Sequence, residues 1–335
     1  MFIVGSYGVA VLLCVITMIC WGSWGNTQKL ASPKWRYELF YWDYTIGLLL
    51  FSIIMAFTFG SIGENGRSFL ADLQQSVGSN LLSALVGGII FNASNILLAA
   101  SVSIAGMAVA FPLGVGLALV LGVFINYFGA PQGNPAMLFA GVGLIVIAII
   151  LNGMAASRKE GNTDNAQKAK KGIILAAIAG ILMSFFYRFV AAAMDFENFE
   201  NPADGMITPY TAFVLFCVGV FLSNLIFNTI VMRRPLEGMA VTYKEYFQGS
   251  IPMHMVGIFG GAVWALGTLS SYIAAGKAGA AISYALGQGA PMIAVIWGVF
   301  VWKEFKGASK GVNRLLFSMF IFFLIGLGFI VYAGV

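Results

Sequence analysis

The chain has 335 residues, of which 60% are hydrophobic and only 9% are charged. A water-soluble protein of this size needs more polar surface, whereas lipid accepts apolar side chains directly, so the composition excludes a soluble globular protein. The net charge of +5 follows from basic loops, as described below, and does not require a nucleic acid partner.

Ten apolar runs follow one another along the chain, each long enough for a helix that crosses a hydrocarbon core of about 30 Å. They cover residues 5–26, 40–60, 81–101, 107–128, 136–156, 172–193, 208–232, 251–275, 280–302 and 314–334. The first run lacks the basic start and the cleavage site of a signal peptide, so we expect it to remain as a helix. The predicted fold class is therefore all-α, a polytopic membrane protein with ten transmembrane helices.

The first two runs carry aromatic and acidic candidates. Trp21 and Trp24 can stack on a flat heterocycle or a sugar ring, although Trp24 lies near the end of its run, where anchoring at the membrane interface is the favoured role. Asp43 lies just inside the second run, where partial burial would let it carry a proton. The alternative for Asp43 is an interaction with the helix dipole or with Arg36.

The third run carries two amides, Asn92 and Asn95, which lie three residues apart and therefore share a helix face. Such amides can donate to and accept from a carbonyl-rich ring, or they can join neighbouring helices for about 1 kcal/mol. In the sixth run, Arg188 is an intramembrane charge. It either extends outward to the acidic connection after this run or holds a substrate or a carboxylate in a cavity.

The eighth and ninth runs supply the remaining candidates. His254 is the only histidine of the chain, and its place near a span end favours a solvated interfacial side chain over a proton relay. Trp264 lies near the middle of its span, so stacking on a ligand is its favoured role. Tyr284 and Gln288 are four residues apart and share a face, and glycines on both sides of Gln288 open space beside it.

Basic residues gather in alternate connections. Fifteen of the eighteen Lys and Arg residues lie in or beside the connections that follow the first, fifth, seventh and ninth runs, whereas the connection 195–204 is purely acidic. The positive-inside bias therefore places these basic connections in the cytoplasm and both termini outside.

The two halves of the chain repeat. Gly87-Gly88 matches Gly260-Gly261, Ala105-Gly106 matches Ala278-Gly279, and Leu113-Gly114 matches Leu286-Gly287 at one constant offset. We therefore expect two five-helix repeats, 1–156 and 172–335, joined by a polar cytoplasmic linker, 157–171. Because five is odd, the repeats must cross the membrane in opposite senses, as in transporters that expose one central site to either side. The alternative is that glycine-rich membrane helices resemble one another by composition alone.

Short motifs distributed over nearly the whole chain resemble those of the ureide permease family, within the drug/metabolite transporter superfamily and beside the glucose/ribose porters. The motifs are Trp21-Gly22-Ser23-Trp24, Trp42-Asp43-Tyr44, Gly60-Ser61-Ile62-Gly63, Gly87-Gly88-Ile89, Asn95-Ile96-Leu97, Asn126-Tyr127-Phe128, Tyr210-Thr211-Ala212-Phe213, Gly260-Gly261 and the segment from Trp297-Gly298 to Glu304.

The resemblance implies proton-coupled import of ureides, such as allantoin, or of oxo-heterocycles, such as uracil. It implies that the third, fourth, eighth and ninth spans line a central cavity. The plant members carry a much longer central loop than 157–171, so no role of that loop is transferred to this chain.

We therefore predict a secondary transporter, with a proton-coupling residue at Asp43 and substrate contacts at Asn92, Asn95, Trp264, Tyr284, Gln288, Trp21 and Arg188. Sugar transport and a non-transporting structural role are the alternatives. One histidine, three scattered cysteines and carboxylates kept almost wholly to the connections argue against an enzyme, and no phosphate-binding loop is present for ATP. The expected partners are a small-molecule substrate, a proton or cation, and the bilayer of a bacterial inner membrane, with a homodimer as one possible assembly; we expect no cofactor, metal or nucleic acid.

Overall fold

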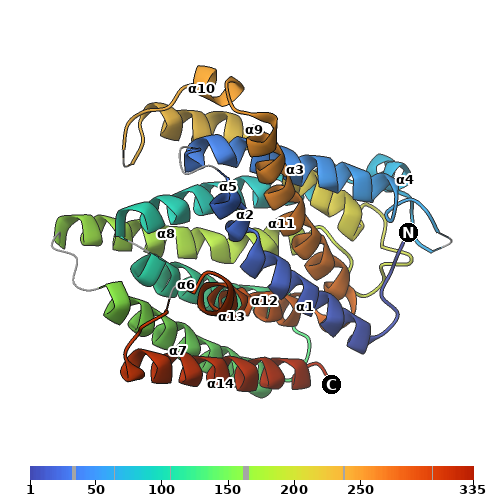
Figure 1. The fold of residues 1–335 in the computed structure, drawn as a ribbon. Helices are drawn as coiled ribbons and strands as arrows, with labels where there is room; N and C mark the ends of the chain where they lie inside the picture. Colours follow the sequence, from blue (N-terminus) through green and yellow to red (C-terminus); the bar gives the residue numbers. More distant parts are fainter. Residues whose placement is uncertain (32–34, 64, 106, 161–165, 237, 304) are drawn as a thin grey trace.

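The computed structural model describes residues 1–335 apart from 32–34, 64, 106, 161–165, 237 and 304. Figure 1 shows a bundle of helices, and among the described residues the only β-structure is a single bridge between Met194 and Ile207. The helices are α1 (Tyr7–Ser23), α2 (Gly25–Leu30), α3 (Tyr37–Phe57), α4 (Phe69–Gln75), α5 (Gly78–Ala105), α6 (Met107–Gly129), α7 (Pro135–Glu160), α8 (Ala166–Ala191), α9 (Pro209–Arg233), α10 (Tyr243–Phe247), α11 (Ile251–Ala278), α12 (Ala280–Gly287), α13 (Ala290–Ile296), the π-helix η1 (Trp297–Val301) and α14 (Lys310–Tyr332).

The predicted all-α, polytopic membrane class is confirmed. Within the described ranges, nine helices are long and apolar enough to cross a membrane, and Leu113–Gly129 in α6 forms a shorter apolar helix. The count of ten spans therefore depends on α6 and stays a prediction. Large apolar side chains such as Leu12, Ile226 and Phe317 are more than half exposed on the outer faces of the bundle, as expected where lipid replaces water.

The central helices of each half pack against helices of the other half. Helix α5 of the first half packs against α8 and α9 of the second half, and α11 of the second half packs against α1 and α3 of the first half. The last long helices of the two halves, α7 and α14, lie side by side at one edge of the bundle (Figure 1). Both termini lie at the same end of the bundle, opposite the end of α7 and the start of α8 (Figure 1).

Four glycines bring the central helices into backbone contact. A Cβ atom at Gly47 of α3 would overlap a backbone carbonyl oxygen of α11, and a Cβ atom at Gly261 of α11 would overlap one of α3. The crossing of α5 with α9 is built in the same way from Gly88 and Gly219. Small residues permit this close approach in membranes. The division into two repeats and their opposite sense in the membrane stay predictions.

The ninth run, predicted over 280–302, is one candidate membrane span over Ala280–Val301, but its helix is interrupted. It is divided into α12, α13 and η1, and Gln288 and Gly289 lie between the first two helices. Pro291 has no N–H to bond the Gly287 carbonyl, so the α-helical ladder is interrupted there. The consequence is that Gln288 lies at a helix break in the middle of the bundle, a position that membrane transporters use for ligand binding.

Candidate functional site

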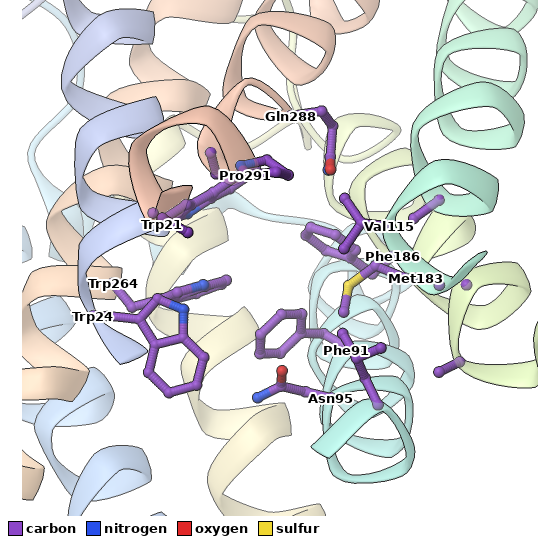
Figure 2. A pocket seen from close by; sticks show the side chains of 18 residues that line it. Trp21, Trp24, Phe91, Asn95, Val115, Met183, Phe186, Trp264, Gln288 and Pro291 are labelled. Atoms are coloured by element: carbon purple, nitrogen blue, oxygen red, sulfur yellow. The ribbon is translucent and has the colours of Figure 1, made fainter. Parts of the chain in front are cut away.

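A cavity of about 130 Å³ lies between the two halves of the bundle, bounded by α1, α5, α6, α8, α11 and the broken ninth span (Figure 2). An apolar cavity of about 150 Å³ in another protein holds benzene, so the space is suited to one small ring. The lining residues are Trp21, Gly22, Trp24, Phe91, Asn95, Leu98, Gly114, Val115, Ala118, Ala179, Gly180, Met183, Phe186, Trp264, Gln288, Ala290, Pro291 and Ala294.

Aromatic rings form one wall of the cavity. The rings of Trp21 and Trp264 stack with centroids 5.9 Å apart, and Phe91 lies 4.5 Å from Trp264. The Trp21 indole N–H donates to the Thr268 hydroxyl at 2.9 Å, which fixes the plane of the ring. Because Trp21 and Trp264 already contact each other, a flat ligand would lie against their outer edge and against Phe91 rather than between the two indoles.

Trp24 differs from the predicted interfacial anchor. It caps the end of α1, and the chain continues directly into α2 instead of leaving the bundle. The indole therefore turns inward, where it lines the cavity and lies 4.7 Å from the ring of Tyr44 on α3.

Two amides stand at opposite ends of the cavity. Figure 2 shows Gln288 reaching in from one end and Asn95 from the other, with the Asn95 oxygen directed toward the space beside Phe91. The side chains are buried, with 7% of Asn95 and 8% of Gln288 exposed. Among the described lining residues none carries a charge. The cavity therefore offers aromatic contact and two neutral amides, a combination that suits an uncharged polar ring.

The other residues predicted for the substrate site lie outside this lining. Asn92 is fully buried between helices, where it accepts from Tyr41 at 2.9 Å and donates to Ser223 at 2.9 Å. The Tyr284 hydroxyl donates to the Ala118 carbonyl at 3.0 Å behind the cavity wall. Arg188 is half-buried beside Gly129, at the end of α6. Asn92 and Tyr284 thus support lining residues, and Arg188 lies away from the cavity.

Several lining residues were not recognised in the sequence because they are apolar. Phe91 and Val115 belong to this group. In the repeat alignment, each of them is equivalent to a candidate residue in the second half of the chain. Phe91 follows the paired glycines of α5 by the same distance as Trp264 follows those of α11, and Val115 stands in the same relation to Gln288. Carrying the repeat alignment through to individual positions would have found them.

A second group of polar residues surrounds Asp43 near the start of α3. The Nδ1 atom of His254 on α11 lies 2.8 Å and 3.0 Å from the two carboxylate oxygens of Asp43. The Tyr246 hydroxyl of α10 donates to the same carboxylate at 2.6 Å. Asp43 has only 1% of its side chain exposed, whereas His254 has 23% exposed. We call Asp43, His254 and Tyr246 the carboxylate cluster.

The partners in this cluster differ from the interpretations favoured by the sequence. His254 was expected as a solvated interfacial residue, but its ring packs edge-on against Trp35 and Tyr246. Arg36, the alternative partner of Asp43, pairs with Glu38 instead. Partial burial and the hydrogen bond to Asp43 both raise the pKa of Tyr246, so its hydroxyl remains a donor at neutral pH.

Comparisons with known proteins agree with the architecture. The chain is 25% identical to ureide permease 4 of Arabidopsis thaliana, in an alignment that covers 97% of this chain and 96% of that protein. It is 23% identical to ureide permease 1 of the same plant, and that alignment covers 97% of each chain. It is 23% identical to a putative sugar uptake protein of Streptococcus agalactiae, over 88% of this chain and 89% of that protein. A solved crystal structure that carries no functional description superposes with a TM-score of 0.58 at 15% identity, over 94% of this chain and 95% of that one, and this similarity concerns the fold alone.

The family model for ureide permeases matches two segments, residues 40–171 and 165–333, and so includes both halves of the chain and most of the residues that line the cavity. The protein belongs to the ureide permease family.

Proposed function

We propose that this protein is a secondary active transporter that takes up a small neutral heterocycle, such as a ureide or a nucleobase-like ring, in the cavity between its two halves. The observation that carries the proposal is the lining itself: aromatic rings on one side, an amide at each end and no charge among the described residues. The flat face of such a ring packs against Phe91 and the outer edges of the Trp21 and Trp264 indoles, and its polar edges meet Asn95 and Gln288.

Proton coupling is assigned to Asp43 together with His254. A buried carboxylate is costly unless it is paired, and the Asp43 carboxylate is paired with the His254 ring and the Tyr246 hydroxyl. The pair can therefore gain and release a proton while Tyr246 keeps its hydrogen bond to the carboxylate. Asp43 packs against Gly257 of α11, and the neighbouring Tyr44 contacts Trp24 and Trp264. A change of charge at Asp43 thus acts on the helix crossing that borders the cavity.

Sugar uptake is the second candidate function. It is supported by the similarity to the streptococcal protein named as a putative sugar uptake protein, and by the suitability of amides and indoles for hydroxylated rings. The neutral lining is compatible with both substrate classes. Binding measurements on the purified protein separate them.

The first experiment measures thermal stabilisation of the purified protein by allantoin, uracil, xanthine, nucleosides, pentoses and hexoses. A ligand that binds only the folded state at 100 times its Kd adds about 2.7 kcal/mol of stability. We expect a shift with allantoin, uracil or xanthine, which should be smaller in Asn95→Leu but retained in Asn80→Leu, a change at an amide outside the cavity lining. Stabilisation by pentoses or hexoses alone would move the protein to the sugar candidate, and stabilisation by none would reject the cavity as a metabolite site.

The second experiment tests coupling in proteoliposomes with an imposed pH gradient. Asp43→Asn and His254→Gln should each abolish accumulation against a concentration gradient while exchange of labelled for unlabelled substrate continues. Asp204→Asn, which removes an exposed carboxylate of an acidic connection, is the matched control. Unchanged gradient-driven accumulation in Asp43→Asn would refute the coupling assignment.

The transport mechanism proposed is a rocking of two inverted repeats, 1–156 and 172–335, about the cavity, in the inner membrane of a bacterial cell with both termini outside. The location of both termini at the end of the bundle opposite the start of α8 supports this arrangement. A reporter that is active only outside the cytoplasm should be active when fused after Val335 and inactive when inserted in the linker 157–171. Cross-linking of the protein in the membrane tests whether it forms a homodimer.

A further inference from the structure

Four buried side chains from three helices form a continuous chain of hydrogen bonds that begins at the cavity. The Asn95 amide nitrogen donates to the Tyr41 hydroxyl at 3.0 Å, and that hydroxyl donates to the Asn92 side-chain oxygen at 2.9 Å. The Asn92 nitrogen donates to the Ser223 hydroxyl at 2.9 Å, which donates to the Gly219 backbone carbonyl at 2.7 Å. Asn92 and Asn95 lie on α5, Tyr41 lies on α3 and Ser223 lies on α9.

The carbonyl at the far end sets the direction of every bond in this chain. A backbone carbonyl can only accept, so the Ser223 hydroxyl donates its single proton there and must accept from Asn92. Asn92 therefore turns its nitrogen toward Ser223 and its oxygen toward Tyr41. Tyr41 gives its one proton to that oxygen, and its own oxygen is left to accept from Asn95.

The remaining polar atom of Asn95 is its side-chain oxygen, which faces the cavity (Figure 2). Within the described part of the chain, no donor bonds this oxygen, although 93% of the residue is buried. Rotating the amide by 180° would aim its nitrogen at the cavity and its oxygen at Tyr41, which has no second proton to give. The chain thus makes that rotation unfavourable by the loss of one buried hydrogen bond.

We propose that Tyr41, Asn92 and Ser223 are positioning residues that hold Asn95 as an acceptor, so that the cavity selects ligands whose edge donates a hydrogen bond. This inference rests on the proposed function and specifies it: the substrate presents a ring N–H, as ureides and lactams do, to Asn95. A ring that offers only carbonyl or ether oxygens at that edge leaves two acceptors facing each other and is rejected. Binding sites whose buried polar groups would lose their partner discriminate strongly in this way.

The test is a double-mutant cycle on uracil affinity, measured by calorimetry on the purified protein. Tyr41→Phe should weaken uracil binding about 3- to 10-fold, the effect of one neutral hydrogen bond, although Tyr41 is absent from the cavity lining. In an Asn95→Leu background the same change should have almost no further effect, because Tyr41 acts through Asn95. Tyr272→Phe is the matched control, since that buried tyrosine of α11 lines no part of the cavity and its hydroxyl has no hydrogen-bond partner among the described residues.

A second variant keeps the test decisive if Tyr41→Phe does not fold. Ser223→Ala removes the far end of the chain on α9 and should weaken uracil binding in the same direction, again only when Asn95 is present. Additive losses in the cycle, or wild-type affinity in both Tyr41→Phe and Ser223→Ala, would overturn the inference while leaving the proposed function intact. If the wild-type protein binds neither uracil nor allantoin, the proposed function fails, and the inference fails with it.

Discussion

Replacing Gln288 by leucine is the sharpest test of the cavity. The substitution keeps a similar volume and removes both polar groups of the amide that reaches in from the helix break between α12 and α13. Stability should change little, because the Tyr284 hydroxyl beside Gln288 keeps its bond to the Ala118 carbonyl at 3.0 Å. Gln288 itself has only 8% of its surface exposed, so water cannot readily replace it.

The expected loss follows from that burial. A polar ligand group placed against leucine in so buried a position loses its partner and is left unsatisfied at a cost of about 1–3 kcal/mol. Because 1.4 kcal/mol is a factor of ten in affinity, Gln288→Leu should weaken binding of allantoin or uracil about 5- to 150-fold. The Kd is measured by calorimetry, with Gln74→Leu as control at an exposed glutamine. A well-folded Gln288→Leu protein that binds within twofold of wild type would refute the assignment.

Two further predictions concern the scaffold. Gly219→Ala should destabilise the protein strongly or prevent folding, because the new Cβ atom would overlap the Leu85 carbonyl of α5. Gly143→Ala, whose Cβ atom would have no heavy atom within 4 Å, should instead raise the melting temperature slightly. Equal melting temperatures for the two variants would contradict the close crossing. In the capping box of α10, hydrogen bonds donated by Thr242 lower the pKa of the Glu245 carboxylate. The contribution of this carboxylate to stability is therefore fully present above the ordinary pKa of 4.5 and is lost as the pH falls through the lowered pKa. The hydrogen-exchange protection factor of the Thr242 amide should fall in that acidic range in wild type and not in Glu245→Gln.

The resemblance found in the sequence is confirmed at the level of the family, and with it the prediction of a transporter rather than an enzyme. Its motifs are short, yet they lie along almost the entire chain and both halves match the family model. Asn95 and Gln288 were chosen because a polar side chain inside an apolar span is costly unless it is satisfied, and because the resemblance places their spans at the cavity. Trp21 and Trp264 were chosen because indoles can stack on flat rings. The structure brings those four residues together around one cavity.

The same argument could not separate residues that face the cavity from residues that support it. Asn92 and Asn95 share a helix face, but only Asn95 lines the cavity, because Tyr41 and Ser223 from two other helices enclose Asn92. Trp24 was expected at the interface because it lies close to the end of its apolar run. The sequence did not show that the chain continues directly into α2, which keeps the indole inside the bundle.

The sequence by itself determined the solvent of this protein, its helical class and its family, because these depend on composition, on run length and on motifs that are local in the chain. The tertiary structure alone decided which side chains meet: His254 and Asp43 are more than two hundred residues apart and are joined only by the crossing of α11 with α3. That crossing depends on glycines that let two backbones touch, and the direction of the hydrogen bonds that end at Asn95 depends on a carbonyl of a third helix. Such contacts between distant segments follow from packing in three dimensions, which periodicity along one segment does not encode.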